Sequence, residues 1–157
     1  MKILGIDPGY DRLGIAIIEK LPKKKEVVLY SDCFTTLSKD TIYKRLSMIG
    51  DEIVRILEKF SPEAIAIETL FITKNQKTAM RVAEARGIII YEAIKMGVDV
   101  FEYSPMEIKT AITSDGTSDK TRMIKMVHLL VDISDKKHDD EYDAIAVALT
   151  HSARIRK

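Results

Sequence analysis

Three β-rich segments in a row, followed by strands and helices in alternation, constrain the fold of this chain most strongly. Apolar and β-branched residues predict strands over 2–7, 13–19 and 26–37. The turn-forming stretch 8–12 and the proline-containing connection 20–25 separate them. Because both connections are short, we expect the three strands to pair as an antiparallel meander.

Further along the chain, single strands alternate with helices. Short apolar runs predict strands over 64–68 and 98–103. Helical spacing and N-cap residues predict helices over 41–60, 75–96, 104–113, 118–131 and 140–154. The sequence contains no internal repeat or low-complexity linker, so it predicts one α/β domain over residues 1–157. The expected sheet is mixed and five-stranded, with three antiparallel and two parallel strands and helices on both faces.

Composition limits the compartment and the partners. With 46% hydrophobic and 31% charged residues, the chain is ordinary for a globular protein, and no apolar stretch approaches the roughly 20 residues of a membrane span. The N-terminal residues lack the layout of a signal peptide, and Cys33 is the single cysteine, so we expect a cytoplasmic protein without membrane contact. Cys33 is expected in the core. The net charge of +1 does not argue for DNA binding, although it permits one basic face.

Two predicted strands end in a carboxylate. Asp7 closes the first strand, just before Pro8 and Gly9, and Glu68 closes the apolar run 64–68. A buried charge is costly unless it is paired or bound to metal, so such endings point to a site. Simpler interpretations also exist. Asp7 fits a turn residue that bonds to its own backbone, and Glu68 fits a surface partner for a lysine.

A third acidic group stands at the head of the last predicted helix. The helix dipole alone explains Asp139, Asp140 and Glu141, but Asp143 lies inside the helix beside the alanine-rich segment 144–148. Asp143 shares a helix face with Asp140 at i, i+3 and with Asp139 at i, i+4, so spacing leaves that choice open. Clustered carboxylates repel one another without a cation, and Mg²⁺ and Mn²⁺ prefer such oxygen ligands. The sequence therefore predicts a metal-dependent nuclease.

Several segments together resemble the RuvC-type Holliday junction resolvases of the RNase H-like superfamily. The resemblance runs from Ile3 to about His151, and the order of strands and helices also matches the RNase H-like architecture. Its most specific parts are the Asp-Pro-Gly end of the first strand and the Asp-x-x-Asp-Ala start of the last helix. Further matching segments are 66–68, 74–75, 85–87 and 100–103.

The resemblance implies roles for seven residues. The metal ligands would be Asp7, Glu68, Asp140 and Asp143, which favours Asp140 over Asp139; each active site would hold two Mg²⁺ ions, with Mn²⁺ as a substitute. Lys109 and Lys120 would act near the scissile phosphate, and either also fits an ordinary surface lysine. Phe71 would stack on a base at the junction centre, and it also fits an ordinary core residue. Apart from the resemblance, we expect DNA contacts from Lys74 and Lys77, which could contribute to a basic face, and from Arg86.

The implied activity is that of a crossover junction endodeoxyribonuclease. It would resolve four-way DNA junctions by paired symmetric nicks that leave 5′-phosphate and 3′-hydroxyl ends. Paired nicks imply a homodimer. The candidate interface is helix 75–96 with Ala79, Ala83 and Gly87. The glycine inside this helix is either simply tolerated there or allows a close contact with another helix or subunit. A branch-migration helicase would be a further partner.

Two alternatives stay open at this stage. One is another RNase H-like nuclease that acts on a different branched or hybrid nucleic acid. The other is a nucleotide-binding actin-like module, because the segment 5–9 resembles the phosphate loop of that fold. Such modules need two lobes, and they do not call for Asp140 and Asp143. Cleavage preference cannot be predicted from these residues.

Overall fold

One mixed sheet forms the centre of the molecule. The computed structural model describes residues 1–70, 75–133 and 137–155. Its strands are β1 (Lys2–Asp7), β2 (Arg12–Glu19), β3 (Val27–Thr35), β4 (Ala64–Glu68) and β5 (Asp99–Tyr103). Their order in the sheet is β3-β2-β1-β4-β5, with β1, β2 and β3 antiparallel and β4 and β5 parallel to β1. The predicted five-stranded mixed sheet is thereby confirmed.

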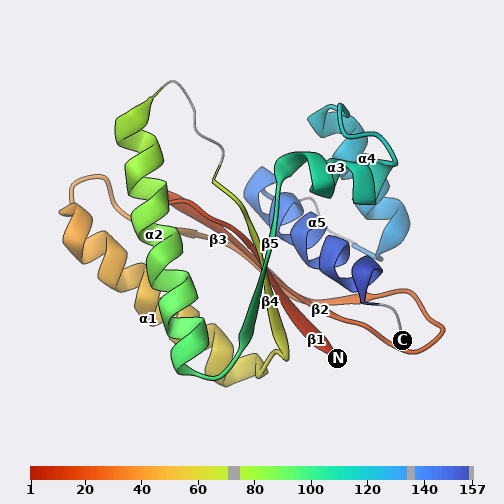
Figure 1. Cartoon of the computed structure of the whole chain (residues 1–157), viewed down its shortest axis with the longest axis horizontal. Coiled ribbons are helices and arrows are strands. Elements are labelled where there is room, and N and C mark those ends of the chain that lie inside the picture. The colour runs from red at the N-terminus through yellow and green to blue at the C-terminus, as the bar shows by residue number, and fades with distance from the viewer. Residues whose placement is uncertain (71–74, 134–136, 156–157) are drawn as a thin grey trace.

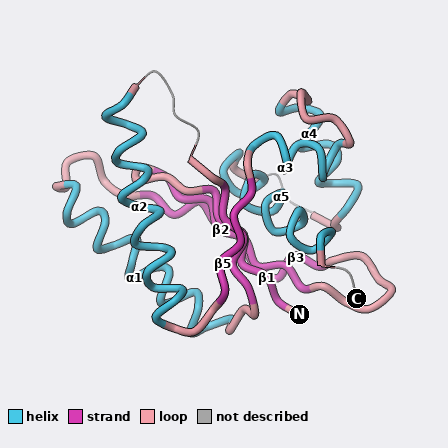
Figure 2. The backbone as a smooth tube through the Cα atoms, in the orientation of Figure 1, coloured by secondary structure: helices cyan, strands magenta, loops and turns pink. Residues whose placement is uncertain are grey.

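Helices cover both faces of this sheet, as predicted (Figure 1). They are α1 (Ile42–Phe60), α2 (Gln76–Lys95), α3 (Pro105–Thr113), α4 (Lys120–Leu130) and α5 (Asp139–Arg154). The first two pack on one face, and the last three lie on the other (Figure 2). Among the described residues, no helix is long and apolar enough to cross a membrane.

Side chains at the helix starts explain where several helices begin. Thr41 accepts a hydrogen bond from the backbone of Lys44 ahead of α1. Ser104 forms a capping box with Glu107 ahead of α3. Asp119 accepts from the backbone of Arg122 at the start of α4. Each of these contacts satisfies an amide that the helix itself leaves without a partner.

Alternation along β1 decides which side chains reach which helices. Leu4 and Ile6 are buried against α1 and α2, whereas Ile3 belongs to the core around α5. Because strand side chains alternate between the two faces, Asp7 points to the same side as Ile3. In β4, Ala66 lies in that same core, so Glu68 points there too. Both strand-end carboxylates are thus directed towards α5.

Two glycines let α5 rest directly on the sheet. A Cβ atom on Gly5 would lie 2.7 Å from the Cβ of Ala148 and would overlap the carbonyl oxygen of Ala144. A Cβ atom on Gly14 would overlap the carbonyl oxygen of Asp140. The absence of both side chains therefore sets how closely the acidic start of α5 approaches β1 and β2.

Gly87 has a different environment from these two glycines. It lies on an exposed part of α2, and an added Cβ would meet nothing within 4 Å. The close helix contact that was considered for Gly87 is therefore not made within the described part of this chain.

Candidate metal centre and cleft

The four predicted metal ligands lie at neighbouring ends of three elements. Asp7 ends β1 and Glu68 ends β4, and these strands run parallel side by side. Asp140 and Asp143 lie in the first turns of α5, which packs against both strands. Sheet and helix together thus gather carboxylates that are far apart in the sequence.

The charges of these four groups act on one another. The pKa of Asp7 is raised to about 8, mainly by burial and further by repulsion from Asp143, Glu68 and Asp140. Burial also raises the pKa of Glu68, with repulsion from Asp143 as the next cause. The pKa of Asp143 is raised mainly by burial, although Lys120 opposes the shift. A cation would offset this repulsion and keep the carboxylates ionised.

Two basic side chains already lie against the acidic group. The ammonium group of Lys120 contacts the carboxylate of Asp143. The Arg12 Nε lies 3.5 Å from Oδ2 of Asp140. Across the described ranges 1–70, 75–133 and 137–155, no three acidic, histidine or cysteine side chains are placed to hold one metal ion. The donor set itself suits a hard divalent cation, since it consists of carboxylate oxygens, and a bound cation would compete with Lys120 and Arg12 for them.

The structure separates Asp140 from Asp139. Asp140 is half-buried and contributes to the raised pKa of Asp7, whereas Asp139 is exposed and has only a small effect on Asp143. Glu141 has a structural role, because its buried carboxylate accepts hydrogen bonds from the backbone of His138 at 3.0 Å and from the hydroxyl of Ser31 at 2.6 Å. The geometry therefore supports Asp140 as the acidic partner of Asp7.

A cleft of about 220 Å³ opens beside the acidic group between α3, α4 and α5. Its lining residues are Glu68, Pro105, Ile108, Lys109, Lys120, Met123, Asp143 and Val147. Lys109 and Lys120, both predicted to act near the phosphate, thus share one cleft with two of the acids. On the other side of Asp7, a second hollow is lined by Arg12, Thr78 and Asp140, among others.

The predicted DNA-contacting residues fall into three groups. Lys77 is exposed in the first turn of α2. Arg86 is half-buried and donates hydrogen bonds to the backbone carbonyl of Glu68 at 3.1 Å and to the carboxylate of Glu102 at 2.7 Å. It therefore holds the strand end that carries Glu68. Phe71 and Lys74 lie outside the described residues.

Sequence reasoning missed the residues that hold the turn after Asp7. Arg45 is buried and donates to the carbonyl of Tyr10 at 3.1 Å and to the hydroxyl of Thr36 at 2.8 Å, and it also pairs with Asp11. Arg12, which approaches Asp140, was not recognised either. In the sequence, an arginine in a helix or after a turn looks like any surface charge, so nothing local marks these two.

The expectation for Cys33 was wrong. This residue lies half-buried on β3 and not in the core, and its Sγ is 3.6 Å from Oδ2 of Asp140. Burial and the neighbouring Asp140 raise the pKa of the thiol to about 11. Cys33 therefore stays protonated at neutral pH and is a poor nucleophile.

Comparison with known sequences places the chain among the junction endonucleases. The family model for crossover junction endodeoxyribonuclease RuvC matches residues 3–151. A protein of that name from Thermosipho melanesiensis is 45% identical over 150 residues, which is 94% of either chain. Another from Brachyspira hyodysenteriae is 41% identical over 156 residues, which is 99% of this chain and 96% of its own.

Solved structures agree with this comparison. T. thermophilus RuvC in complex with a Holliday junction substrate superposes with a TM-score of 0.91 at 29% identity, over 97% of this chain and 93% of that chain. The yeast mitochondrial Holliday junction resolvase Ydc2 gives a TM-score of 0.72 over 94% of this chain and 76% of that chain. At 14% identity, the second likeness shows the fold alone. Together they confirm the predicted RNase H-like fold.

Proposed function

The chain belongs to the family of RuvC crossover junction endodeoxyribonucleases, and we propose that it resolves four-way DNA junctions by paired, symmetric, metal-dependent nicks. The observation that carries this proposal is the meeting of four carboxylates at the neighbouring ends of β1, β4 and α5, beside the cleft that Glu68 and Asp143 line. The pKa values of Asp7, Glu68 and Asp143 are all raised, mainly by burial and further by repulsion from neighbouring carboxylates, as expected of an acidic group that binds cations. The family model covers the strands and the helix that supply these residues.

We assign the metal-binding role to Asp7, Glu68, Asp140 and Asp143, with two Mg²⁺ ions per active site and Mn²⁺ as a substitute. Such ions supply activation of a water molecule and charge stabilisation of the attacking and leaving oxygens. The chain itself orients the ligands: Arg86 holds the end of β4 behind Glu68. Cleavage would leave 5′-phosphate and 3′-hydroxyl ends.

The two cleft lysines would bind and stabilise the phosphate that is cut. Lys109 and Lys120 line the cleft together with Glu68 and Asp143, so a phosphate drawn to the acidic group would meet positive charge from α3 and α4. Stabilisation of developing charge at a fixed position is the largest contribution that such side chains make. The ammonium group of Lys120 also pairs with the carboxylate of Asp143.

A junction has two strands to cut, so we propose that two copies of the chain act together. The homodimer would use α2, whose exposed face carries Met80, Tyr91 and Ile94 beside Ala83 and Gly87. A two-fold dimer would place its active sites symmetrically on the junction. We further propose action on DNA in the cytoplasm, alongside a branch-migration helicase. Sedimentation at micromolar concentration tests the dimer, and a monomer would count against it.

Incubation with a synthetic four-way junction tests the proposed function. The reactions would contain the purified protein with Mg²⁺, Mn²⁺ or EDTA, and a linear duplex of the same sequence would serve as the control. Symmetric nicks on the junction alone, dependent on the metal, are the expected result. Equal cutting of duplex or of an RNA–DNA hybrid would point to another RNase H-like nuclease. The proposal would be refuted if the protein neither bound nor cut any of these substrates.

The raised pKa of Asp7 makes the stability of the metal-free protein depend on pH. Its folded pKa is about 8 against an ordinary value of 3.8, so the folded state holds an extra proton between these values. The stabilisation from this proton is complete below about pH 4 and is lost as the pH rises through about 8, with a slope of at most about 1.4 kcal/mol per pH unit. At fixed metal concentration, deprotonation should also favour metal binding, so cleavage should increase over the same range.

Urea unfolding in EDTA measures this effect. Between about pH 5.5 and about pH 8.5, the wild-type protein should lose free energy of unfolding relative to Asp7→Asn, which cannot titrate at this position. The comparison removes the contribution of the titrating groups that do not interact with Asp7, so the difference reports Asp7 together with the acids coupled to it. A stability difference that stays constant with pH would contradict the raised pKa.

A further inference from the structure

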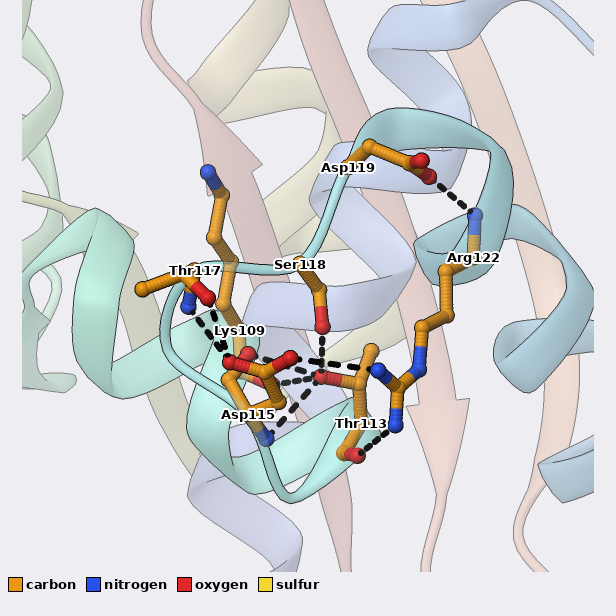
Figure 3. A network of polar contacts seen from close by, with 7 residues as sticks. All are labelled: Lys109, Thr113, Asp115, Thr117, Ser118, Asp119 and Arg122. Carbon is orange, nitrogen blue, oxygen red and sulfur yellow. Dashed lines mark hydrogen bonds and ion pairs between the residues drawn. The ribbon is translucent and has the colours of Figure 1, made fainter.

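A hydrogen-bonded network joins the end of α3, which carries Lys109, to the start of α4 (Figure 3). Its buried centre is the pair of hydroxyls of Thr113 and Ser118, 2.5 Å apart. The Thr113 hydroxyl also lies 2.8 Å from the backbone carbonyl of Lys109, one helical turn earlier. The network therefore begins on the turn of α3 that carries Lys109.

Asp115 is the residue that connects most of this network. Its Oδ1 accepts from the backbone amide of Thr117 at 2.9 Å and from the Thr117 hydroxyl at 2.7 Å. Its Oδ2 accepts from Nη1 of Arg122 at 3.1 Å. The hydrogen bonds from Thr117 are the main reason why the pKa of Asp115 lies below its ordinary value, so Asp115 is ionised at neutral pH. One carboxylate thus closes the turn and holds a side chain of α4.

Arg122 completes the connection back to α3. Its Nη2 donates to the backbone carbonyl of Thr113 at 3.3 Å, so a residue of the first turn of α4 satisfies a carbonyl that the end of α3 leaves without a helical partner. Gly116 fits closely against α3 as well, because an added Cβ would lie 2.9 Å from side-chain atoms of Met106 and Thr110. The turn is therefore fixed to α3 from both sides.

The position of this network matters because of the residues at its two ends. Lys120 is the first residue of α4, and its ammonium group reaches Asp143 in the cleft. Lys109 extends from α3, away from the network in Figure 3, and lines the same cleft. Eleven positions of chain separate the two lysines, and the turn is where α3 and α4 join. Whatever fixes the turn therefore fixes the spacing of the two lysines.

We propose that Asp115 is a positioning residue that, through Thr117 and Arg122, fixes the α3–α4 turn so that Lys109 and Lys120 face one cleft at a set spacing. The proposal rests on the nuclease function proposed above. Junction binding draws on many phosphate contacts, so loss of Asp115 should weaken it little. The chemical step depends on where positive charge lies, so the same loss should slow cleavage.

Spin labels give a test of position that does not need activity. Labels on K109C and K120C, in a C33S background, would report the distance distribution between the two lysine positions by double electron–electron resonance. We expect D115A to broaden or shift this distribution and D115N to do so less, because asparagine keeps an acceptor for Thr117 but loses the acceptor for Arg122. The exposed residue Asp99, on β5, provides the control D99A. A distribution that D115A leaves unchanged would overturn the proposal.

Single-turnover cleavage then tests the consequence. D115A should slow cleavage about tenfold while junction affinity, measured in EDTA, stays within about twofold, and D115N should recover to within about threefold of wild type. In a K109A/K120A background, D115A should slow cleavage by less than about twofold more, because it acts through these two lysines. Equal slowing in both backgrounds, or wild-type cleavage by D115A, would overturn the proposal. A wild-type protein that cuts no junction would instead refute the proposed function, and the spin-label result would still decide the position of the lysines.

Discussion

In Asp7→Asn, we expect junction cleavage to disappear while junction binding survives. Single-turnover cleavage should fall by about 10³-fold or more, because loss of a metal-binding carboxylate removes several kcal/mol of transition-state stabilisation. Asparagine has nearly the same size, and it is neutral without the proton that Asp7 must take up in the folded, metal-free protein. The metal-free variant should therefore be at least as stable as the wild type. Affinity for the junction should stay within about threefold, since contacts to phosphates elsewhere dominate binding.

Two control variants sharpen this prediction. Asp99→Asn changes an exposed acid at the start of β5 and should cut at the wild-type rate. Asp139→Asn changes the exposed neighbour of Asp140. Its cleavage rate should fall by less than about threefold, because Asp139 is not among the causes of the raised pKa of Asp7. Cleavage by Asp7→Asn at more than about a tenth of the wild-type rate would remove Asp7 from the metal site.

Gly5→Ala should cost the protein about 1–3 kcal/mol of unfolding free energy or more. The new methyl group would overlap the carbonyl oxygen of Ala144 and lie 2.7 Å from the Cβ of Ala148. The atom it overlaps belongs to a helix backbone, so relief requires α5 to move away from β1. Since α5 carries Asp140 and Asp143, cleavage should fall together with stability. Urea unfolding and the junction assay on the same preparation measure both effects.

Gly87→Ala is the matched control for this substitution. An added Cβ at Gly87 meets nothing within 4 Å, and the residue lies inside α2. Alanine should therefore stabilise the protein by about 0.5–1 kcal/mol through its higher helix propensity. If Gly5→Ala is as stable as the wild type, α5 does not rest on β1 in the way described. A loss of stability in Gly87→Ala at protein concentrations that favour dimers would instead indicate a close contact between subunits.

Most of the fold follows from local patterns in the sequence. The order of strands and helices was predicted correctly, and the strand over 64–68 was predicted with its observed bounds. Helix starts were found because residues such as Ser104 and Thr41 cap the backbone beside them in the sequence. The predicted third strand was too long at its C-terminal end, since β3 already ends at Thr35. Strand ends are set by pairing with a neighbour, and that information is not local.

The candidate site was predictable only in part. Asp7 and Glu68 stood out because charged residues rarely end apolar strands, whereas the choice between Asp139 and Asp140 depends on how α5 is rotated against the sheet. Helical spacing does not supply that rotation. The packing of α5 on Gly5 and Gly14, like the contact of Arg86 with the end of β4, exists only after distant segments meet. The same holds for the network around Asp115, which needs Arg122 from the next helix.

Anomalous diffraction from crystals soaked in Mn²⁺ tests the central claim most directly. We expect anomalous peaks within coordination distance of the carboxylates of Asp7, Glu68, Asp140 and Asp143, with the Lys120 ammonium displaced from Asp143. The same soak of Asp7→Asn should weaken or remove these peaks. The assignment of the metal site would be contradicted by crystals that show no Mn²⁺ at these four carboxylates after a soak at a saturating Mn²⁺ concentration. The crystals must come from a preparation that cuts junctions.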